Sequence, residues 1–149
     1  MKPLIILLGT FVLSVLALKI FAKESNYQLA GRNAMACMLV FTAIGHFVFM
    51  EGMAAMVPSF IPFSKQVVLV TGFAEILFAF CLLLPQYQRP TAWLLIFFFI
   101  LILPANIKAG LEEINYRTGQ MNGPGINYLW FRVPLQLFFI LWVYVTSIR

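Results

Sequence analysis

Five long apolar runs constrain the fold of this chain more than any other feature. A helix of about 20 apolar residues crosses the roughly 30 Å of hydrocarbon in a bilayer. Only 10% of the 149 residues are charged, whereas a soluble domain carries roughly a quarter. We therefore predict an all-α integral membrane protein, a bundle of helices in the lipid bilayer. The runs cover residues 3–22, 34–49, 67–84, 91–108 and 126–145.

The polar stretches between these runs are too short to fold alone, so residues 1–149 are expected to form one membrane domain. The first run follows Lys2 and has features of a signal peptide with Ala22 at the cleavage edge. It is long for a signal peptide, and Ile20 occupies a position where a small residue is required. We expect it to remain as an added N-terminal transmembrane helix, followed by a polar linker over residues 23–33.

An apolar segment that contains two prolines follows the second run. Pro58 and Pro62 exclude one continuous helix there, yet the segment is too apolar to lie in water. We predict that residues 51–63 bend over the mouth of the bundle, beside His46 and near a loop at residues 110–125. The segment then acts either as a lid on the interior or as a plain interfacial connector.

The net charge of +5 comes from basic residues scattered at the ends of the apolar runs. Such residues anchor spans, so the charge does not indicate nucleic-acid binding. Five spans place the termini on opposite sides, and the side of the C-terminus is slightly richer in Lys and Arg. The positive-inside rule then predicts the N-terminus outside and the C-terminus inside. The inner set is Lys19, Lys23, Arg32, Arg89 and Arg149, and the outer set is Lys2, Lys65, Lys108 and Arg117.

One acidic residue, Glu75, lies near the middle of an apolar run. A carboxylate at that depth costs about 3 kcal/mol or more, so it normally faces a partner or a wet cavity. Arg132, in the last run, is the candidate partner. We predict that the two side chains lie within the reach of an ion pair or of one bridging water.

Further polar residues fall at the same depth because neighbouring spans run in opposite directions. His46 and Asn106 lie near the ends of the second and fourth runs. Arg132 and Glu75 lie roughly 9 and 12 Å inside the fifth and third runs, at 1.5 Å per residue. Three of these helices carry a second polar residue four positions away, on the same face of the helix. The pairs are Thr42 and His46, Thr71 and Glu75, and Arg132 and Gln136. The predicted site comprises His46, Glu75, Asn106, Arg132 and Gln136, with Thr42 and Thr71 as supporting residues.

Two interpretations of this site remain open. Ionisable groups inside a membrane bind ligands or relay protons, but polar side chains also serve as contacts between helices, worth about 0.6 to 2 kcal/mol each. A metal is not expected, because one His and the separated Cys37 and Cys81 provide too few ligands. The chain also has no nucleotide-binding or serine-hydrolase motif.

Short segments of this sequence resemble the DoxX-like family of small multi-pass bacterial membrane proteins. The order and spacing of the segments carry the resemblance, which covers about residues 34–145. It implies a four-helix core, with residues 3–22 as an added helix, in the bacterial cytoplasmic membrane. The recurring polar positions of the family match the five predicted site residues. The segments are AIGHFVF (43–49), MVPSFIP (56–62), TGFAEI (71–76), LLLP (82–85), LPANI (103–107) and WFRVPLQ (130–136).

The resemblance does not fix an activity, because relatives include redox-associated subunits, chaperones and cargo receptors. We expect an accessory membrane subunit of a redox system rather than a stand-alone enzyme, with a quinone or another lipid-soluble molecule as the possible ligand. A partner redox protein or a homo-oligomer is the expected assembly. A non-enzymatic assembly or chaperone-like protein and a small proton-coupled transporter remain alternatives.

Overall fold

A computed structural model describes residues 2–23 and 26–149. The chain is all-α, and these residues contain no β-strand. The fold class predicted from the apolar runs is thus confirmed. The elements are α1 (Lys2–Ala17), the π-helix η1 (Leu18–Ala22), α2 (Tyr27–Val48), α3 (Met50–Met56), α4 (Ser64–Leu83), α5 (Gln88–Leu111) and α6 (Gly125–Ser147).

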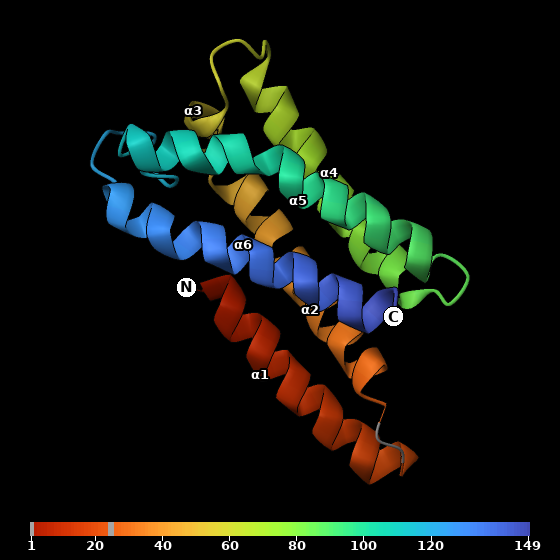
Figure 1. Ribbon diagram of the computed structural model, residues 1–149. Coiled ribbons are helices and arrows are strands. Elements are labelled where there is room, and N and C mark those ends of the chain that lie inside the picture. The colour runs from red at the N-terminus through yellow and green to blue at the C-terminus, as the bar shows by residue number, and fades with distance from the viewer. Residues whose placement is uncertain (1, 24–25) are drawn as a thin grey trace.

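Four long helices form a bundle in which each packs against two neighbours (Figure 1). Helix α2 packs against α4 and α6, and α5 closes the ring by packing against the same two helices. Consequently α4 and α6 lie diagonally opposite one another. This order of neighbours decides which polar side chains can meet.

The first helix lies outside this ring, along α2 (Figure 1). Leu7 is fully buried, and the ring of Phe11 packs edge-on against Trp142 of α6, with 5.1 Å between the centroids. Asn33 of α2 donates a hydrogen bond to Ser14 at 3.0 Å. The expected N-terminal helix therefore packs against the bundle through specific contacts.

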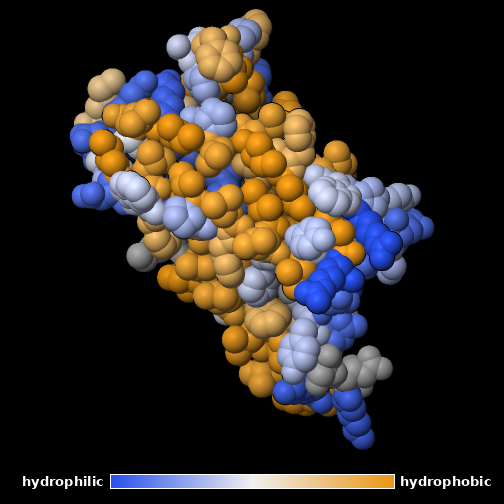
Figure 2. Space-filling model, in the orientation of Figure 1, coloured by the Kyte–Doolittle hydropathy of each residue, from blue (hydrophilic) through white to orange (hydrophobic). Residues whose placement is uncertain are grey.

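The surface is suited to a lipid bilayer. Hydrophobic residues cover the middle of the molecule, and hydrophilic residues gather towards its two ends (Figure 2). Four helices are each long and apolar enough to cross a membrane, and α2 with α3 makes a fifth candidate if this bent pair is one span. The chain is therefore a multi-pass membrane protein by the length and composition of its helices.

Several helices begin earlier than the apolar runs predicted. Helix α2 starts at Tyr27, within the predicted linker, because the Asn26 side chain accepts a hydrogen bond from the Leu29 amide at 2.9 Å and caps the helix. Arg32 and Asn33 continue the helix because α6 and α1 supply partners for their polar groups. The remaining linker residues 24 and 25 lie outside the described residues.

The proline-containing segment forms a short helix and a turn. Helix α3 is bent by 96° from α2, and the chain turns through residues 57–63 before α4 begins. Phe63, at φ 58°, adopts a left-handed conformation directly before α4. We call residues 51–63 the cap segment. The prediction that this segment is not an ordinary span is confirmed.

The two ends of the bundle interior differ in polarity. One half is an apolar core built from the start of α2, the end of α4, the start of α5 and the end of α6. The other half contains Glu75, Asn106 and Gln136, three of the buried polar residues, while Thr91 and Ser147 are buried at the far end of the apolar half. The core residues include Met35, Leu39, Leu82, Leu95 and Val143, all fully buried.

Candidate functional site

Glu75 and His46 face one another between α4 and α2. A Glu75 carboxylate oxygen, Oε2, lies 3.3 Å from the His46 Nδ1, and the Glu75 side chain is only 4% exposed. Nδ1 is also 3.0 Å from the Thr42 carbonyl, which can only accept a hydrogen bond, so Nδ1 carries the hydrogen. That hydrogen is directed to Thr42, and Oε2 has no hydrogen-bond partner among the described residues.

A second polar pair joins α5 to α6. The Asn106 side-chain amide donates a hydrogen bond to the Gln136 Oε1 at 2.8 Å, and the Gln136 amide donates to the Phe99 carbonyl. All three groups are buried. Pro104 lies inside α5 and lacks the amide hydrogen that would bond the carbonyl four residues earlier. The carbonyl that Pro104 leaves without its usual helical bond is that of Ile100, next in the chain to Phe99, whose carbonyl accepts from Gln136.

Arg132 differs from its predicted arrangement. Within the described residues, no ion pair of 4.0 Å or less joins it to Glu75, whose ion-pair partner is His46. The Arg132 guanidinium lies over the Tyr128 ring instead, 5.4 Å from the centroid. The reason is the order of the helices, because α6 is diagonal to α4 whereas α2 is its neighbour. A water-mediated link between Glu75 and Arg132 stays a prediction.

The two threonines support the helices rather than the site directly. Thr42 donates to carbonyls of its own helix, at 3.0 Å from the Leu39 oxygen, and Thr71 donates to the Val68 carbonyl at 2.9 Å. Such bonds to the preceding turn satisfy a hydroxyl inside a membrane helix. The Thr42 contribution to the site is its carbonyl, which holds the His46 ring.

Gly72 is a site residue that the sequence reasoning missed. A Cβ at this position would lie 3.0 Å from the His46 Cβ and 3.3 Å from the Phe47 ring. The glycine therefore lets α2 and α4 approach closely beside Glu75. Its position one turn before an intramembrane acid was the available signal, since small residues mark close contacts between membrane helices.

An aromatic layer separates the polar half from the apolar core. The rings of Phe78 and Phe98 are 5.6 Å apart, and those of Phe99 and Phe139 are 6.0 Å apart. Phe98 and Phe99 are themselves 6.2 Å apart, so the four rings form one continuous stack across the bundle. Phe78 and Phe139 each follow a polar site residue by about one helical turn, which places the layer directly beside the polar half.

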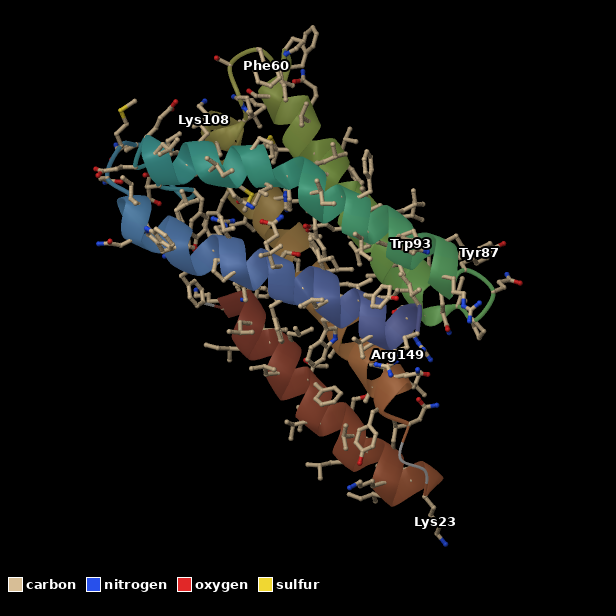
Figure 3. All side chains as sticks on the ribbon, viewed as in Figure 1. Lys23, Phe60, Tyr87, Trp93, Lys108 and Arg149 are labelled. Carbon is tan, nitrogen blue, oxygen red and sulfur yellow. The ribbon has the colours of Figure 1, made fainter. Side chains whose placement is uncertain are left out.

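The cap segment is fixed to the end of α5 and the loop that follows it. Lys108 donates hydrogen bonds to the carbonyls of Ala55 and Val57, at 3.1 and 2.9 Å. A Cβ on Gly52 would lie 2.1 Å from the Tyr116 carbonyl oxygen, so only glycine allows this approach. Lys108 lies beside α3 in Figure 3, and Phe60 extends from the tip of the turn. The expected position near the 110–125 loop is confirmed.

These cap contacts include two residues whose roles the sequence did not reveal. Lys108 was expected only as an anchor at the end of a span, and Gly52 was not singled out. Near the site itself, the Met53 methyl group lies 3.5 Å from a Cβ built on Gly45, one residue before His46. The cap segment therefore borders the helix that carries the imidazole.

Comparison with known proteins places the chain in a family without giving it an activity. No curated protein and no solved structure matches it. A family match covers residues 35–147, from the first half of α2 to the end of α6. All five predicted site residues and the cap segment fall within that match. The chain belongs to the family described as a domain of unknown function, DUF8561.

Proposed function

We propose that this multi-pass membrane protein binds a lipid-soluble molecule, a quinone in the first instance, at the polar half of its bundle. In this proposal it is an accessory subunit of a redox system in the bacterial cytoplasmic membrane, with the N-terminus outside. The resemblance to DoxX-like proteins, some of which are redox-associated, supports the choice of ligand. The ligand-binding residues are His46, Glu75, Asn106, Arg132 and Gln136.

The observation that carries the proposal is the carboxylate oxygen of Glu75 without a hydrogen-bond partner. A buried acceptor left unpaired costs about 1 to 3 kcal/mol, and more when it is charged. The His46 Nδ1 lies 3.3 Å from this oxygen, but its hydrogen is directed to the Thr42 carbonyl. An acid in this state is suited to accept a hydrogen bond from a ligand or to exchange a proton with one.

A quinone matches the groups that surround this acid. Its carbonyl oxygens accept hydrogen bonds, which the half-buried Arg132 can donate, and which His46 can donate from Nε2 when its ring is protonated. Reduction of a quinone to a quinol adds two electrons and two protons. Glu75 would pass protons to the quinone oxygens, and a partner redox protein would supply the electrons.

The cap segment suggests how such a ligand enters. Phe60 and Phe63 are 82% and 72% exposed, on a turn that joins two membrane-spanning helices. Exposed aromatic side chains at this level are suited to the bilayer interface. In the proposal, the cap segment covers the polar half, and a hydrophobic ligand passes beneath it from the bilayer.

The Asn106–Gln136 pair favours a second candidate function. Its donors and acceptors meet within the protein, which is how a polar group fixes the packing of two membrane helices. On this view the protein is a non-enzymatic assembly or chaperone-like membrane protein. The two candidate functions differ in whether Glu75 binds a ligand or contributes only to the packing of the helices.

Two measurements test the proposal. Native mass spectrometry of gently extracted protein should reveal a co-purifying lipid-soluble molecule. Titration of the purified protein with decylubiquinone should raise its melting temperature, because a ligand at 100 times its Kd stabilises by about 2.7 kcal/mol. Glu75→Gln should weaken the binding of the reduced form, decylubiquinol, about tenfold in apparent affinity, because the quinol hydroxyl then donates to a neutral amide instead of a carboxylate.

The matched control is Glu112→Gln, the same change at an exposed acid whose cationic neighbour, Lys108, is 3.8 Å away. It should leave the binding of decylubiquinol unchanged. If decylubiquinone does not shift the melting temperature of the wild type, or if both variants bind decylubiquinol alike, the ligand-binding role of Glu75 is wrong. A loss of stability on Asn106 substitution would then favour the structural alternative.

A further inference from the structure

A polar pocket opens at the other end of the bundle, far along the helices from Glu75. It has a volume of about 230 Å³ and lies between the start of α2, the α4–α5 turn and the end of α6. Pockets for drug-sized ligands have roughly 300 to 1,000 Å³, so this one suits a single small polar group. It is lined by Gln28, Arg32, Pro85, Gln86, Gln88, Arg89, Thr146, Ser147, Ile148 and Arg149.

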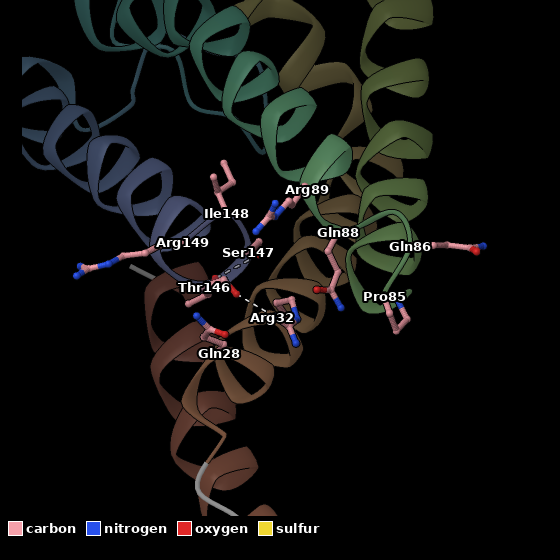
Figure 4. Close-up of a pocket in the computed structure, with 10 residues that line it drawn as sticks. All are labelled: Gln28, Arg32, Pro85, Gln86, Gln88, Arg89, Thr146, Ser147, Ile148 and Arg149. Atoms are coloured by element: carbon pink, nitrogen blue, oxygen red, sulfur yellow. Dashed lines mark hydrogen bonds between the residues drawn. The ribbon is translucent and has the colours of Figure 1, made fainter.

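The charge of this lining is of one sign. Three of the ten residues are arginines, and none is acidic. Figure 4 shows Arg32 and Arg89 turned towards the space between α2, α5 and α6, whereas Arg149 points away from it. The other seven lining residues have neutral side chains, so no acidic side chain in the wall balances the arginines. Such a cavity favours an anion.

Arg32 is held in place with one donor unused. Its Nη1 donates to the Thr146 carbonyl at 3.0 Å, while its Nε is buried and has no partner among the described residues. Gly31 allows this arrangement, because it lets α6 approach so closely that a Cβ would lie 2.3 Å from a Thr146 methyl group. Trp142 fixes the same contact by donating to the Gly31 carbonyl at 3.0 Å. The wall behind Arg32 is therefore preorganised.

Exposed aromatic residues at this end of the bundle indicate that the pocket faces the headgroup region of the bilayer, because such residues mark the membrane interface. They include Tyr27, Tyr87, Trp93 and Tyr144, and the Trp93 and Tyr144 rings pack together with 6.5 Å between centroids. Tyr87 and Trp93 appear beside Arg149 in Figure 3. A planar guanidinium fork at this depth matches the oxygens of a phosphate group.

We propose that this pocket binds a phosphate group, through Arg32 and Arg89, either on an anionic phospholipid headgroup or as the free anion. This inference is independent of the quinone proposal, since it concerns the opposite end of the helices. A bound phosphate would form ion pairs with the guanidinium groups of Arg32 and Arg89, both of which line the pocket. The amides of Gln28 and Gln88 supply further donors in the wall.

Titration of the purified full chain with dioctanoyl phosphatidylglycerol, dioctanoyl phosphatidylcholine or inorganic phosphate tests the inference, with native mass spectrometry as the readout. Phosphatidylglycerol should bind at one site and more tightly than phosphatidylcholine. Arg89→Gln should weaken that binding about fivefold or more, since a basic residue near anionic lipid contributes about 1 kcal/mol. Arg89 is exposed at the start of α5, so the variant should fold, and its melting curve verifies this.

The matched control is Lys23→Gln, which removes one exposed charge at the same end but outside the pocket. It should change the affinity less than twofold. If inorganic phosphate at millimolar concentration displaces phosphatidylglycerol from the wild type but not from Arg89→Gln, the result supports the site and identifies the free anion as its ligand. Equal affinity for the two lipids, or equal losses in Arg89→Gln and Lys23→Gln, would overturn it.

Discussion

Gly52→Ala should detach the cap segment from the loop after α5. A Cβ at Gly52 would lie 2.1 Å from the Tyr116 carbonyl oxygen and 2.5 Å from its carbon, whereas ordinary contact begins at 3.4 Å. These are backbone atoms, so the loop must retreat by about 1 Å rather than rotate a side chain. Overpacking of this kind costs about 1 to 3 kcal/mol, against about 1 kcal/mol gained in helix propensity.

The retreat also pulls the cap segment away from Lys108, whose two hydrogen bonds to the Ala55 and Val57 carbonyls are 3.1 and 2.9 Å long. Losing one charged hydrogen bond adds about 1.5 kcal/mol or more. The expected net loss is therefore about 2 kcal/mol. In a chain of this size it lowers the melting temperature by roughly 4 to 8 °C.

Thermal unfolding in detergent measures this loss, and Gly9→Ala is the matched control. A Cβ on Gly9 has no neighbour within 4 Å, so this change should leave stability unaltered or raise it through helix propensity. A cysteine at Met53, on a background without Cys37 and Cys81, reports whether the cap segment has moved. A water-soluble maleimide should label it several times faster in the Gly52→Ala protein. Equal melting temperatures and labelling rates in the two alanine variants would refute the reasoning.

Three further outcomes are expected. Leucine substitutions at Asn106 and Gln136, singly and together, should show in a double-mutant cycle a coupling of about 0.6 to 2 kcal/mol, measured by unfolding. Lys108→Met should speed maleimide labelling of the cap segment. Lys65→Met removes the exposed ion pair to Glu51 of the same segment and should change the labelling little, because an exposed pair contributes at most about 1 kcal/mol. Arg132→Gln should lower the melting temperature by only a few degrees, because it removes a cation–π contact and no ion pair; a collapse of the fold would show that Arg132 pairs with Glu75 after all.

The sequence predicted that polar residues on neighbouring helices share one level along the bundle, and two such pairs meet. Apolar runs fix where each helix crosses, and the rise per residue then fixes how deep a side chain lies. The structure accordingly brings His46 to Glu75 and Asn106 to Gln136. The order of helices around the ring could not be derived in the same way. That order depends on small residues such as Gly72 and Gly31, which decide which pairs of helices approach closely.

The apolar runs also predicted helix starts that are later in the chain than the observed ones. The helices α4, α5 and α6 all begin one to three residues before their apolar runs, because a helix continues into the interface wherever its polar groups find partners. At Arg32 that partner is the Thr146 carbonyl, more than a hundred residues away in the chain. A contact of such range leaves no local pattern in a sequence.

The aromatic layer beneath the polar half has an electrical consequence. Phe78, Phe98, Phe99 and Phe139 lie on one side of Glu75, so the bundle on that side of the carboxylate is apolar. Glu75 lies roughly two fifths of the way into the bilayer at 1.5 Å per residue. A charge moved across the whole membrane gains or loses about 2.3 kcal/mol per 100 mV. A charge at the level of Glu75 would therefore feel about 1 kcal/mol of each 100 mV, so the membrane potential acts directly on this part of the bundle.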